Sequence, residues 1–186
     1  MIEITKITEC DNPQFIKPSR VFYVQNGRRK SWEVVETYDS VAILLYEEDE
    51  EAFILVKQFR PAVYMKNGDG FTYELCAGLI DKNKPIETIA KEEVYEECGY
   101  EIKRSDLLKI TSFHTAVGFA GGRQTLFFSK VSKRQKKSPG GGIDDEMIEI
   151  VKLPLKSARE FMFDESKAKT PGLLFAFMWF FERYKK

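Results

Sequence analysis

The chain has 186 residues and a mass of 21.6 kDa, which is the size of one ordinary globular domain. Its residues are 43% hydrophobic and 31% charged, which supplies a core and excludes a disordered chain. The 29 basic residues balance the 29 acidic residues, which argues against a nucleic-acid binder that works through a broad basic surface.

The sequence gives no indication of secretion or of a membrane. The first residues lack the apolar core and basic flank of a signal peptide, and the longest apolar run, 173–181, is too short to cross a bilayer. The three cysteines, Cys10, Cys76 and Cys98, lack a metal-binding spacing, and their odd number argues against a disulfide framework. We therefore expect a cytoplasmic protein without membrane contact.

The first predicted elements are strands. Asn26-Gly27 stands between two extended runs and predicts a two-residue hairpin turn. Two apolar runs, 40–46 and 53–59, predict a second hairpin around the acidic stretch 47–51, which we expect to be a solvated turn. Residues 61–70 are expected to form a loop that ends in a turn.

A short strand is predicted at 71–77, and a helix follows it. Pro85 is expected to open this helix, where its missing N–H does no harm, and Gly99 to close it as a left-handed cap. The basic, glycine-rich stretch 132–142 is expected to be a mobile loop.

The remaining elements complete an α+β pattern. Strands are predicted at 107–113, 124–130 and 148–153, and helices at 155–163 and 172–184. We predict one mixed β-sheet sandwiched by helices over residues 39–186. Residues 1–38 are predicted to form a small N-terminal β extension.

The helix predicted at 85–98 carries a cluster of glutamates. Glu93 and Glu97 lie on one stripe of the helix, with Glu92 and Glu96 beside it. A cluster of this kind is usually a solvated face. The alternative is a divalent-cation site, because carboxylate oxygens suit Mg²⁺ or Mn²⁺.

The residues around this helix resemble the Nudix box of the diphosphate hydrolases. That box reads Gly, five residues, Glu, seven residues, Arg, Glu, an apolar residue, any residue, Glu, Glu, any residue, Gly and an apolar residue. The residues in register are Gly78, Glu93, Val94, Glu96, Glu97, Gly99 and Tyr100. Lys84 replaces the first Glu, and Glu92 replaces the Arg that organises the acidic cluster in the family.

The resemblance extends to the nucleoside-diphosphate-sugar branch of the family. The segments ELCAG, EECGY, GRQTLFF and PGGG resemble the UDP-glucose pyrophosphatases, whereas ADP-ribose enzymes usually have Pro at the position of Cys76. The resemblance implies a Nudix fold and Mg²⁺-dependent hydrolysis of a UDP-sugar to a nucleoside monophosphate and a sugar phosphate. ADP-ribose is the second candidate substrate.

The resemblance also implies the metal ligands. Glu93 and Glu97 would be direct ligands, with Glu96 as a ligand or catalytic partner and the backbone carbonyl of Ala77 as a further ligand. Glu74 would be an acceptor behind these groups or an ordinary strand carboxylate. Mg²⁺ is the implied cofactor, with Mn²⁺ as a substitute.

In this branch the general base is usually a glutamate on a loop late in the domain. The resemblance therefore implies Glu146, with Asp145 in reserve. The alternative is that these residues, with Asp144, are solvated loop charges and that the Glu96–Glu97 pair holds the attacking water.

Substrate contacts are implied at three positions. Arg60 matches the branch's substrate-binding Arg, although it could instead pair with the acidic turn on the surface, and Arg123 is a second phosphate candidate. Trp32 lies in a segment that crosses to the partner in related dimers, which implies a homodimer in which Trp32 stacks on the base or lies in the dimer core. His114, the only histidine, is more often packed or exposed than catalytic.

Two further functions compete with this one. A catalytically impaired nucleotide-sugar binding module is favoured by the missing box Arg and opposed by the retained acidic cluster. Hydrolysis of RNA caps or of mutagenic nucleotides shares the box, but the zero net charge argues against a capped-RNA substrate.

Overall fold

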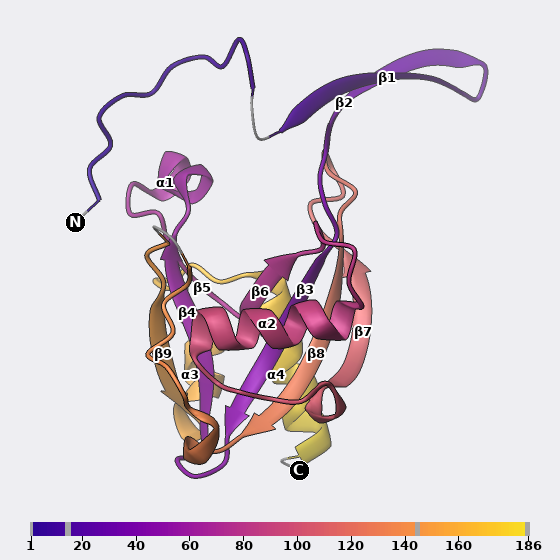
Figure 1. Ribbon diagram of the computed structural model, residues 1–186. Helices are drawn as coiled ribbons and strands as arrows, with labels where there is room; N and C mark the ends of the chain where they lie inside the picture. The colour runs from indigo at the N-terminus through magenta and orange to yellow at the C-terminus, as the bar shows by residue number, and fades with distance from the viewer. Residues whose placement is uncertain (1, 14–15, 144–145, 185–186) are drawn as a thin grey trace.

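A computed structural model describes residues 2–13, 16–143 and 146–184 (Figure 1). Its strands and α-helices, in chain order, are β1 (Lys17–Gln25), β2 (Arg28–Glu36), β3 (Ser40–Glu47), β4 (Ala52–Phe59), α1 (Pro61–Asn67), β5 (Phe71–Glu74), β6 (Cys76–Leu79), α2 (Ile86–Cys98), β7 (Leu108–His114), β8 (Arg123–Val131), β9 (Glu149–Pro154), α3 (Leu155–Phe163) and α4 (Pro171–Tyr184). Two short 3₁₀ helices, η1 (Arg104–Asp106) and η2 (Lys133–Gln135), complete the order.

A seven-stranded mixed sheet forms the centre of the molecule. Its main path runs β5-β4-β3-β8-β7, with β6 paired to β3 and β9 paired to β4. The β3–β8 pair is parallel and the others are antiparallel. The predicted mixed sheet is therefore confirmed.

Helices cover both faces of this sheet. Helix α2 lies on one face, where Ile89, Val94 and Cys98 join a buried cluster with β3 and β4 residues. Helix α4 lies on the other face, where Leu173 and Phe177 join a second buried cluster. Figure 1 shows the same order of layers, with α2 in front of the sheet and α3 and α4 behind it. The predicted sandwich of helix, sheet and helix is confirmed.

The first two strands form a separate hairpin. Asn26 and Gly27 have φ angles of 52° and 72°, which is the conformation that a two-residue turn of this kind requires. Strands β1 and β2 pair only with each other among the described strands, and the hairpin projects away from the mixed sheet in Figure 1. Every residue of β1 is exposed.

Residues 61–67 form helix α1, so the prediction of a loop over this segment was wrong. Pro61 lies in the first turn, where its fixed φ angle suits a helix, and Gly68 closes the helix with a left-handed φ of 74°. Seven residues are too few for a helical pattern to appear in the sequence.

Two further predictions need correction. The strand predicted at 71–77 is divided at Leu75 into β5 and β6, which pair with different strands, β4 and β3. Glu47 is not a residue of a solvated turn, because it ends β3 and is fully buried. Its carboxylate lies 2.7 Å from the Lys152 ammonium on β9, and this pairing compensates the buried charge.

Among the described helices, none is long and apolar enough to span a bilayer.

Candidate active site

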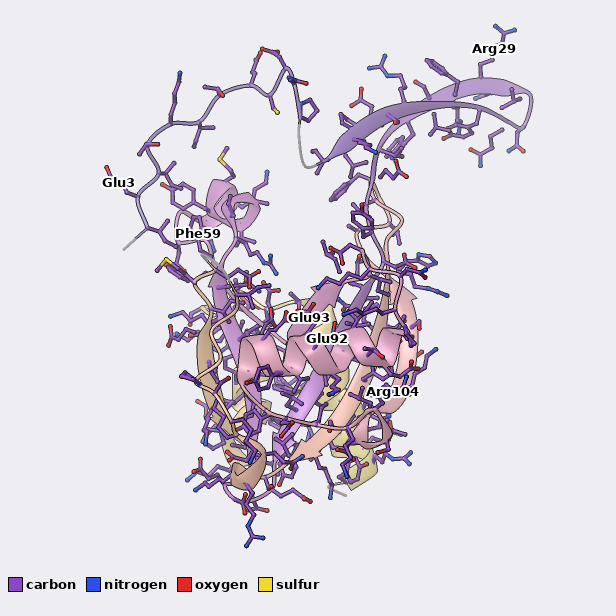
Figure 2. All side chains as sticks on the ribbon, in the orientation of Figure 1. Glu3, Arg29, Phe59, Glu92, Glu93 and Arg104 are labelled. Carbon is purple, nitrogen blue, oxygen red and sulfur yellow. The ribbon has the colours of Figure 1, made fainter. Side chains whose placement is uncertain are left out.

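Helix α2 supplies the acidic side chains of the site. Pro85 precedes its first residue, and Gly99 ends it in a left-handed conformation, with an N–H that donates to the carbonyls of Tyr95 and Val94. Because the face that carries Val94 is buried in the core, Glu97 is drawn into the interior while Glu92 stays near solvent. Figure 2 shows Glu92 and Glu93 midway along the helix.

A cleft of about 470 Å³ opens beside this helix. Six of the eight site residues predicted from the sequence line it: Arg60, Ala77, Glu93, Glu96, Glu97 and Glu146. They come from the end of β4, from β6, from α2 and from the loop before β9. The fold thus brings together residues that are up to 86 positions apart, the separation between Arg60 and Glu146.

Strand β6 and helix α2 approach each other closely at Gly78. A Cβ atom on this glycine would lie 2.1 Å from the carboxyl carbon of Glu93, so a residue with a side chain would displace Glu93. One residue earlier, the Ala77 N–H donates to Glu97 Oε2 at 3.0 Å. The glycine and the backbone of β6 therefore position two of the box glutamates.

Burial raises the pKa values of these two carboxyls. The pKa of Glu97 rises to about 8, chiefly because the carboxyl is desolvated, and the hydrogen bond from Ala77 opposes the rise. The pKa of Glu93 rises to about 7 through desolvation and then through the charge of Glu96, with Lys82 opposing. The charged forms of these two carboxyls are therefore disfavoured in the cleft as it stands, and a bound cation would favour them.

The donor set fits a hard divalent cation. As the side chains stand, no three described His, Cys, Asp or Glu residues converge closely enough to enclose a metal ion. The cleft nevertheless gathers carboxylate oxygens from Glu93, Glu96 and Glu97, which are the ligand type that Mg²⁺ and Mn²⁺ take. The raised pKa values of Glu93 and Glu97 show that a cation would relieve their desolvation and repulsion.

Glu146 reaches the cleft from a glycine-rich loop. Its Oε2 accepts the N–H of Ile143 at 3.0 Å. Gly142 has a φ of 90°, and a Cβ there would lie 2.4 Å from the same oxygen. The charge of Glu146 acts on Arg60, Glu93 and Glu97, so it lies close to the other predicted site residues. The reserve base Asp145 and its neighbour Asp144 lie outside the described residues.

The loop that carries Glu146 is attached to the end of helix α2. The Gly141 N–H donates to the Glu97 carbonyl at 2.8 Å, and the N–H groups of Lys137 and Ser138 donate to the Gly99 carbonyl. These bonds satisfy carbonyls that a helix end leaves unpaired. Residues 133–135 also form η2. The loop predicted over 132–142 is therefore interrupted by a short helix and anchored to the end of α2, and its mobility stays a prediction.

Arg60 forms a two-pronged ion pair inside the cleft. Its Nε and Nη2 donate to the two Glu74 oxygens at 2.8 and 2.7 Å, so the pairing with the acidic turn, considered as an alternative, is wrong. A guanidinium has five N–H donors, and Glu74 takes two, which leaves three for another ligand. Thr72 also donates to Glu74. Glu74 thus fixes the orientation of the Arg60 guanidinium.

Two predicted residues lie outside the set that lines the cleft. Arg123 has its Nε 3.5 Å from Asp39 Oδ2, and its backbone N–H donates to the same carboxylate. The Trp32 indole donates to the Gly118 carbonyl at 2.6 Å, and the side chain stays 58% exposed. His114 is exposed and contacts the Gly121 carbonyl through Nδ1 at 2.9 Å. The substrate roles of Arg123 and Trp32 remain predictions.

The structure adds cleft residues that the sequence did not indicate. Lys82 lines the cleft and lowers the pKa of Glu93, and Gln58, Asp81 and Gln124 line it as well. Lys82 and Asp81 occupy positions at which the box accepts any residue, so the resemblance to the box did not indicate that they line the cleft.

The two departures from the box contact each other. Lys84 Nζ donates to both carboxylate oxygens of Glu92 at 2.8 Å. The box has Glu at the first of these positions and Arg at the second, so this chain has an ion pair with the two charges exchanged. In this chain the loop before α2 is thus paired to Glu92, the residue next to Glu93, although the box Arg is absent.

Residues 37–171 match the NUDIX domain family, which decides the assignment. The chain belongs to the Nudix family. It is 39% identical to the uridine diphosphate glucose pyrophosphatase NUDT14 of Bos taurus, over 97% of this chain and 94% of that one. It is 35% identical to the GDP-mannose pyrophosphatase of Klebsiella pneumoniae subsp. pneumoniae, over 73% of this chain and 68% of that one. The chain is thus a Nudix hydrolase.

A solved structure shares the Nudix fold. The crystal structure of an ADP compounds hydrolase superimposes with a TM-score of 0.72 and covers 95% of this chain and 92% of its own. Its sequence identity is 18%, so the likeness concerns the fold alone.

Proposed function

We propose that this Nudix hydrolase cleaves the diphosphate linkage of a nucleoside-diphosphate sugar, in the first place a UDP-sugar such as UDP-glucose. The products are a nucleoside monophosphate and a sugar phosphate. The observation that carries the proposal is the single cleft that joins Glu93 and Glu97 to Arg60 and Glu146. The uridine diphosphate glucose pyrophosphatases among the relatives support this substrate, and ADP-ribose is the second candidate.

Glu93, Glu97 and the carbonyl of Ala77 are the proposed ligands of Mg²⁺, with Mn²⁺ as a substitute and Glu96 beside them. A divalent cation held there would draw charge from the phosphates and lower the pKa of a nearby water. The surrounding residues hold the carboxylates in place, because Gly78 leaves room for Glu93 and the Ala77 N–H donates to Glu97.

The diphosphate is proposed to lie against the cations of the cleft. Arg60 keeps three N–H donors after its pairing with Glu74, and its orientation is fixed by that pair. Lys82 lines the same cleft and offers a second positive charge. Arg123 is proposed as a further phosphate contact, for which its side chain would have to leave Asp39.

Glu146 is proposed as the general base. It takes a proton from the attacking water while the new bond to phosphorus forms and the bridging P–O bond breaks, and the electrons pass to the leaving phosphate. The exposed carboxylate at the edge of the cleft is accessible to water. Glu96 is the proposed partner of the metal ligands, and the Glu96–Glu97 pair is the alternative holder of the water.

The active form is proposed to be a homodimer in the cytoplasm. The β1–β2 hairpin exposes Phe22, Val24 and Trp32, and a hairpin without a covered face is not stable in water alone. Phe22 and Val24 lie on one face of the hairpin, and Trp32, opposite Val21, lies on the other. A second copy that covers Phe22 and Val24 would supply the missing core and leave Trp32 free to stack on the base. The thiols of Cys10, Cys76 and Cys98 are free, as in a reducing compartment.

The test of this function is a panel of UDP-glucose, GDP-mannose and ADP-ribose with Mg²⁺, in which nucleotide and sugar phosphate are resolved. We expect the highest kcat/KM for UDP-glucose, and loss of turnover by at least about a hundredfold in EDTA or in Glu97→Gln. No turnover of any of the three substrates would contradict the proposal and favour the binding module. Full activity in EDTA would contradict the metal site.

A further inference from the structure

A second cavity, of about 380 Å³, adjoins the catalytic cleft. The end of β7 and the start of α4 form its outer walls, and Glu74, Ala77 and Gln124 line both this cavity and the cleft. The two cavities therefore lie side by side, with these three residues at their boundary. We call this cavity the side pocket.

The inner wall of the side pocket is set by a glycine. A Cβ on Gly172 would lie 2.8 Å from Gln124 Oε1 and 3.3 Å from the ring of Phe113, so a side chain there would move into occupied space. Phe113 is held in turn by an edge contact with Phe175, with ring centroids 6.1 Å apart. Phe113, Leu75 and Pro171 give the pocket apolar walls.

Most of the polar groups that line the side pocket are hydrogen-bond acceptors. Gln124 uses its Nε2 to donate to Ser40 at 3.3 Å, which leaves its Oε1 to accept. Because a carbonyl can only accept, His114 donates to Gly121 through Nδ1, and its Nε2 remains an acceptor when the ring is neutral. The third group is the carboxylate of Glu74, which lies between Arg60 and the pocket.

These acceptors distinguish between the parts of the substrate. A phosphate is repelled by Glu74, and a uracil ring offers one N–H donor and two carbonyl acceptors. A pyranose offers several hydroxyl donors and an apolar C–H face, which matches acceptors set among apolar walls. Thr170 contributes a hydroxyl that can rotate to either role.

We propose that the side pocket binds the sugar ring of the substrate, with its hydroxyls on Glu74, Gln124 and Thr170 and its C–H face on Phe113. The sugar is joined directly to the diphosphate, and the pocket adjoins the cleft, with Glu74 and Ala77 lining both. This inference rests on the proposed function, since it assigns a position to the sugar of a nucleoside-diphosphate sugar.

The test compares two substrates that share uridine and the diphosphate: UDP-glucose and the methyl ester of UDP, which lacks the sugar. Thr170→Val removes one hydroxyl at equal volume, and Gly172→Ala displaces Gln124 and Phe113, two of the groups proposed to contact the sugar. We expect kcat/KM for UDP-glucose to fall about three- to tenfold in the first variant and at least about tenfold in the second. Turnover of the methyl ester should stay at the wild-type level in both.

The matched control is Thr111→Val on β7, which lies outside both sets of lining residues and should leave both substrates unchanged. Equal losses on the two substrates would assign the pocket to the uridine half or to general packing and overturn the inference, as would no loss on either. Thermal melting identifies a variant that fails to fold, and Thr170→Val then decides. A wild-type protein that hydrolyses no nucleoside-diphosphate sugar overturns the proposed function itself.

Discussion

At the scale of single residues, the proposed catalytic cleft depends on a few side chains whose neighbours fix them. Glu74 fixes Arg60, the Ala77 N–H fixes Glu97, and the Ile143 N–H holds Glu146. Glu146 differs from the box glutamates because it is exposed and lies on a loop, which suits the proposed role of general base.

Glu146→Gln should lower kcat by about a hundredfold or more, because the amide cannot take the proton of the attacking water. Substrate and metal affinity should stay near those of the wild type, since the proposed phosphate and metal contacts are elsewhere. Steady-state kinetics and calorimetric titration of Mg²⁺ measure both. A loss smaller than about tenfold would mean that the helix carboxylates hold the water themselves.

The exchanged ion pair offers a second prediction at this scale. Lys84→Glu should lower kcat by about tenfold, because two carboxylates would then face each other next to Glu93. The double variant Lys84→Glu with Glu92→Arg restores the order of charges in the box and should recover most of the activity. Because both side chains are partly exposed, the change in the free energy of unfolding should stay below about 1 kcal/mol.

The readout that separates positioning from stability is a double-mutant cycle on kcat together with melting temperature. A double variant that is as slow as Lys84→Glu would show that the pair does not position Glu93. Lys91→Glu, on the same helix, is the control for added negative charge, since no ion pair or hydrogen bond of the Lys91 side chain occurs among those of the described residues.

At the scale of elements, the site depends on how helix α2 ends. Its final carbonyls accept N–H groups from the loop 137–142, so that the loop with Glu146 is held against the helix with Glu97. The glycines make this possible: a Cβ on Gly140 would lie 2.4 Å from the Glu97 carbonyl oxygen. The end of the helix and the position of Glu146 are thus coupled.

Gly142→Ala should lower kcat strongly, by about tenfold or more, while the protein still folds. The φ of 90° strains any residue with a Cβ, and the new atom would lie 2.4 Å from Glu146 Oε2 and displace it. Gly118→Ala is the matched control, because nothing lies within 4 Å of its Cβ position and its φ is not positive. Equal activity of the two variants, measured with the same substrate, would show that Glu146 does not take part in catalysis.

At the scale of the whole molecule, the buried carboxyls link stability to pH. Burial raises the pKa of Glu97 to about 8 and that of Glu93 to about 7 in the folded protein, above the unfolded value of about 4.5. Between the unfolded and the folded pKa values, the two carboxyls have lost their protons in the unfolded chain but keep them in the folded protein. The folded protein therefore binds more protons in this range, and the free energy of unfolding falls as the pH rises. Below the unfolded pKa the penalty is absent.

The metal-free protein should therefore melt at a lower temperature at pH 8 than at pH 5.5, by several degrees. Glu97→Gln should reduce this difference, because the amide does not titrate, and Mg²⁺ should reduce it at pH 8 by neutralising the carboxylates. Differential scanning calorimetry in EDTA and in Mg²⁺ measures both effects. A melting temperature that rises with pH over this range would contradict the burial of these carboxyls as the dominant effect.

The N-terminal hairpin leads to a prediction about assembly. Because Phe22 and Val24 are exposed on β1, we expect light scattering to give the mass of a dimer at micromolar concentration. Replacement of both by Ser should shift the equilibrium to the monomer, whereas replacement of the exposed Phe163 on α3, far from the hairpin in Figure 1, should not. A monomeric wild-type protein would refute the dimer and weaken the stacking role of Trp32.

The sequence by itself determined the elements whose signals are local. The Asn26-Gly27 turn, the apolar strand 40–46, and the helix between Pro85 and Gly99 follow from backbone preferences and from periodicity, which neighbouring residues express directly. The spacing of the box glutamates is equally local, so the helical period alone assigns Glu93 and Glu97 to one face of one helix.

Only the tertiary structure decided which distant groups meet. That Arg60 pairs with Glu74, that Lys84 pairs with Glu92, that the glycine-rich loop closes the end of α2, and that Glu47 is buried against Lys152 depends on contacts between elements. No periodicity encodes such contacts, because each depends on how strands are ordered in the sheet and how the helix packs on it. The side pocket has the same origin, since its walls come from strands and a helix that only the completed sheet brings together.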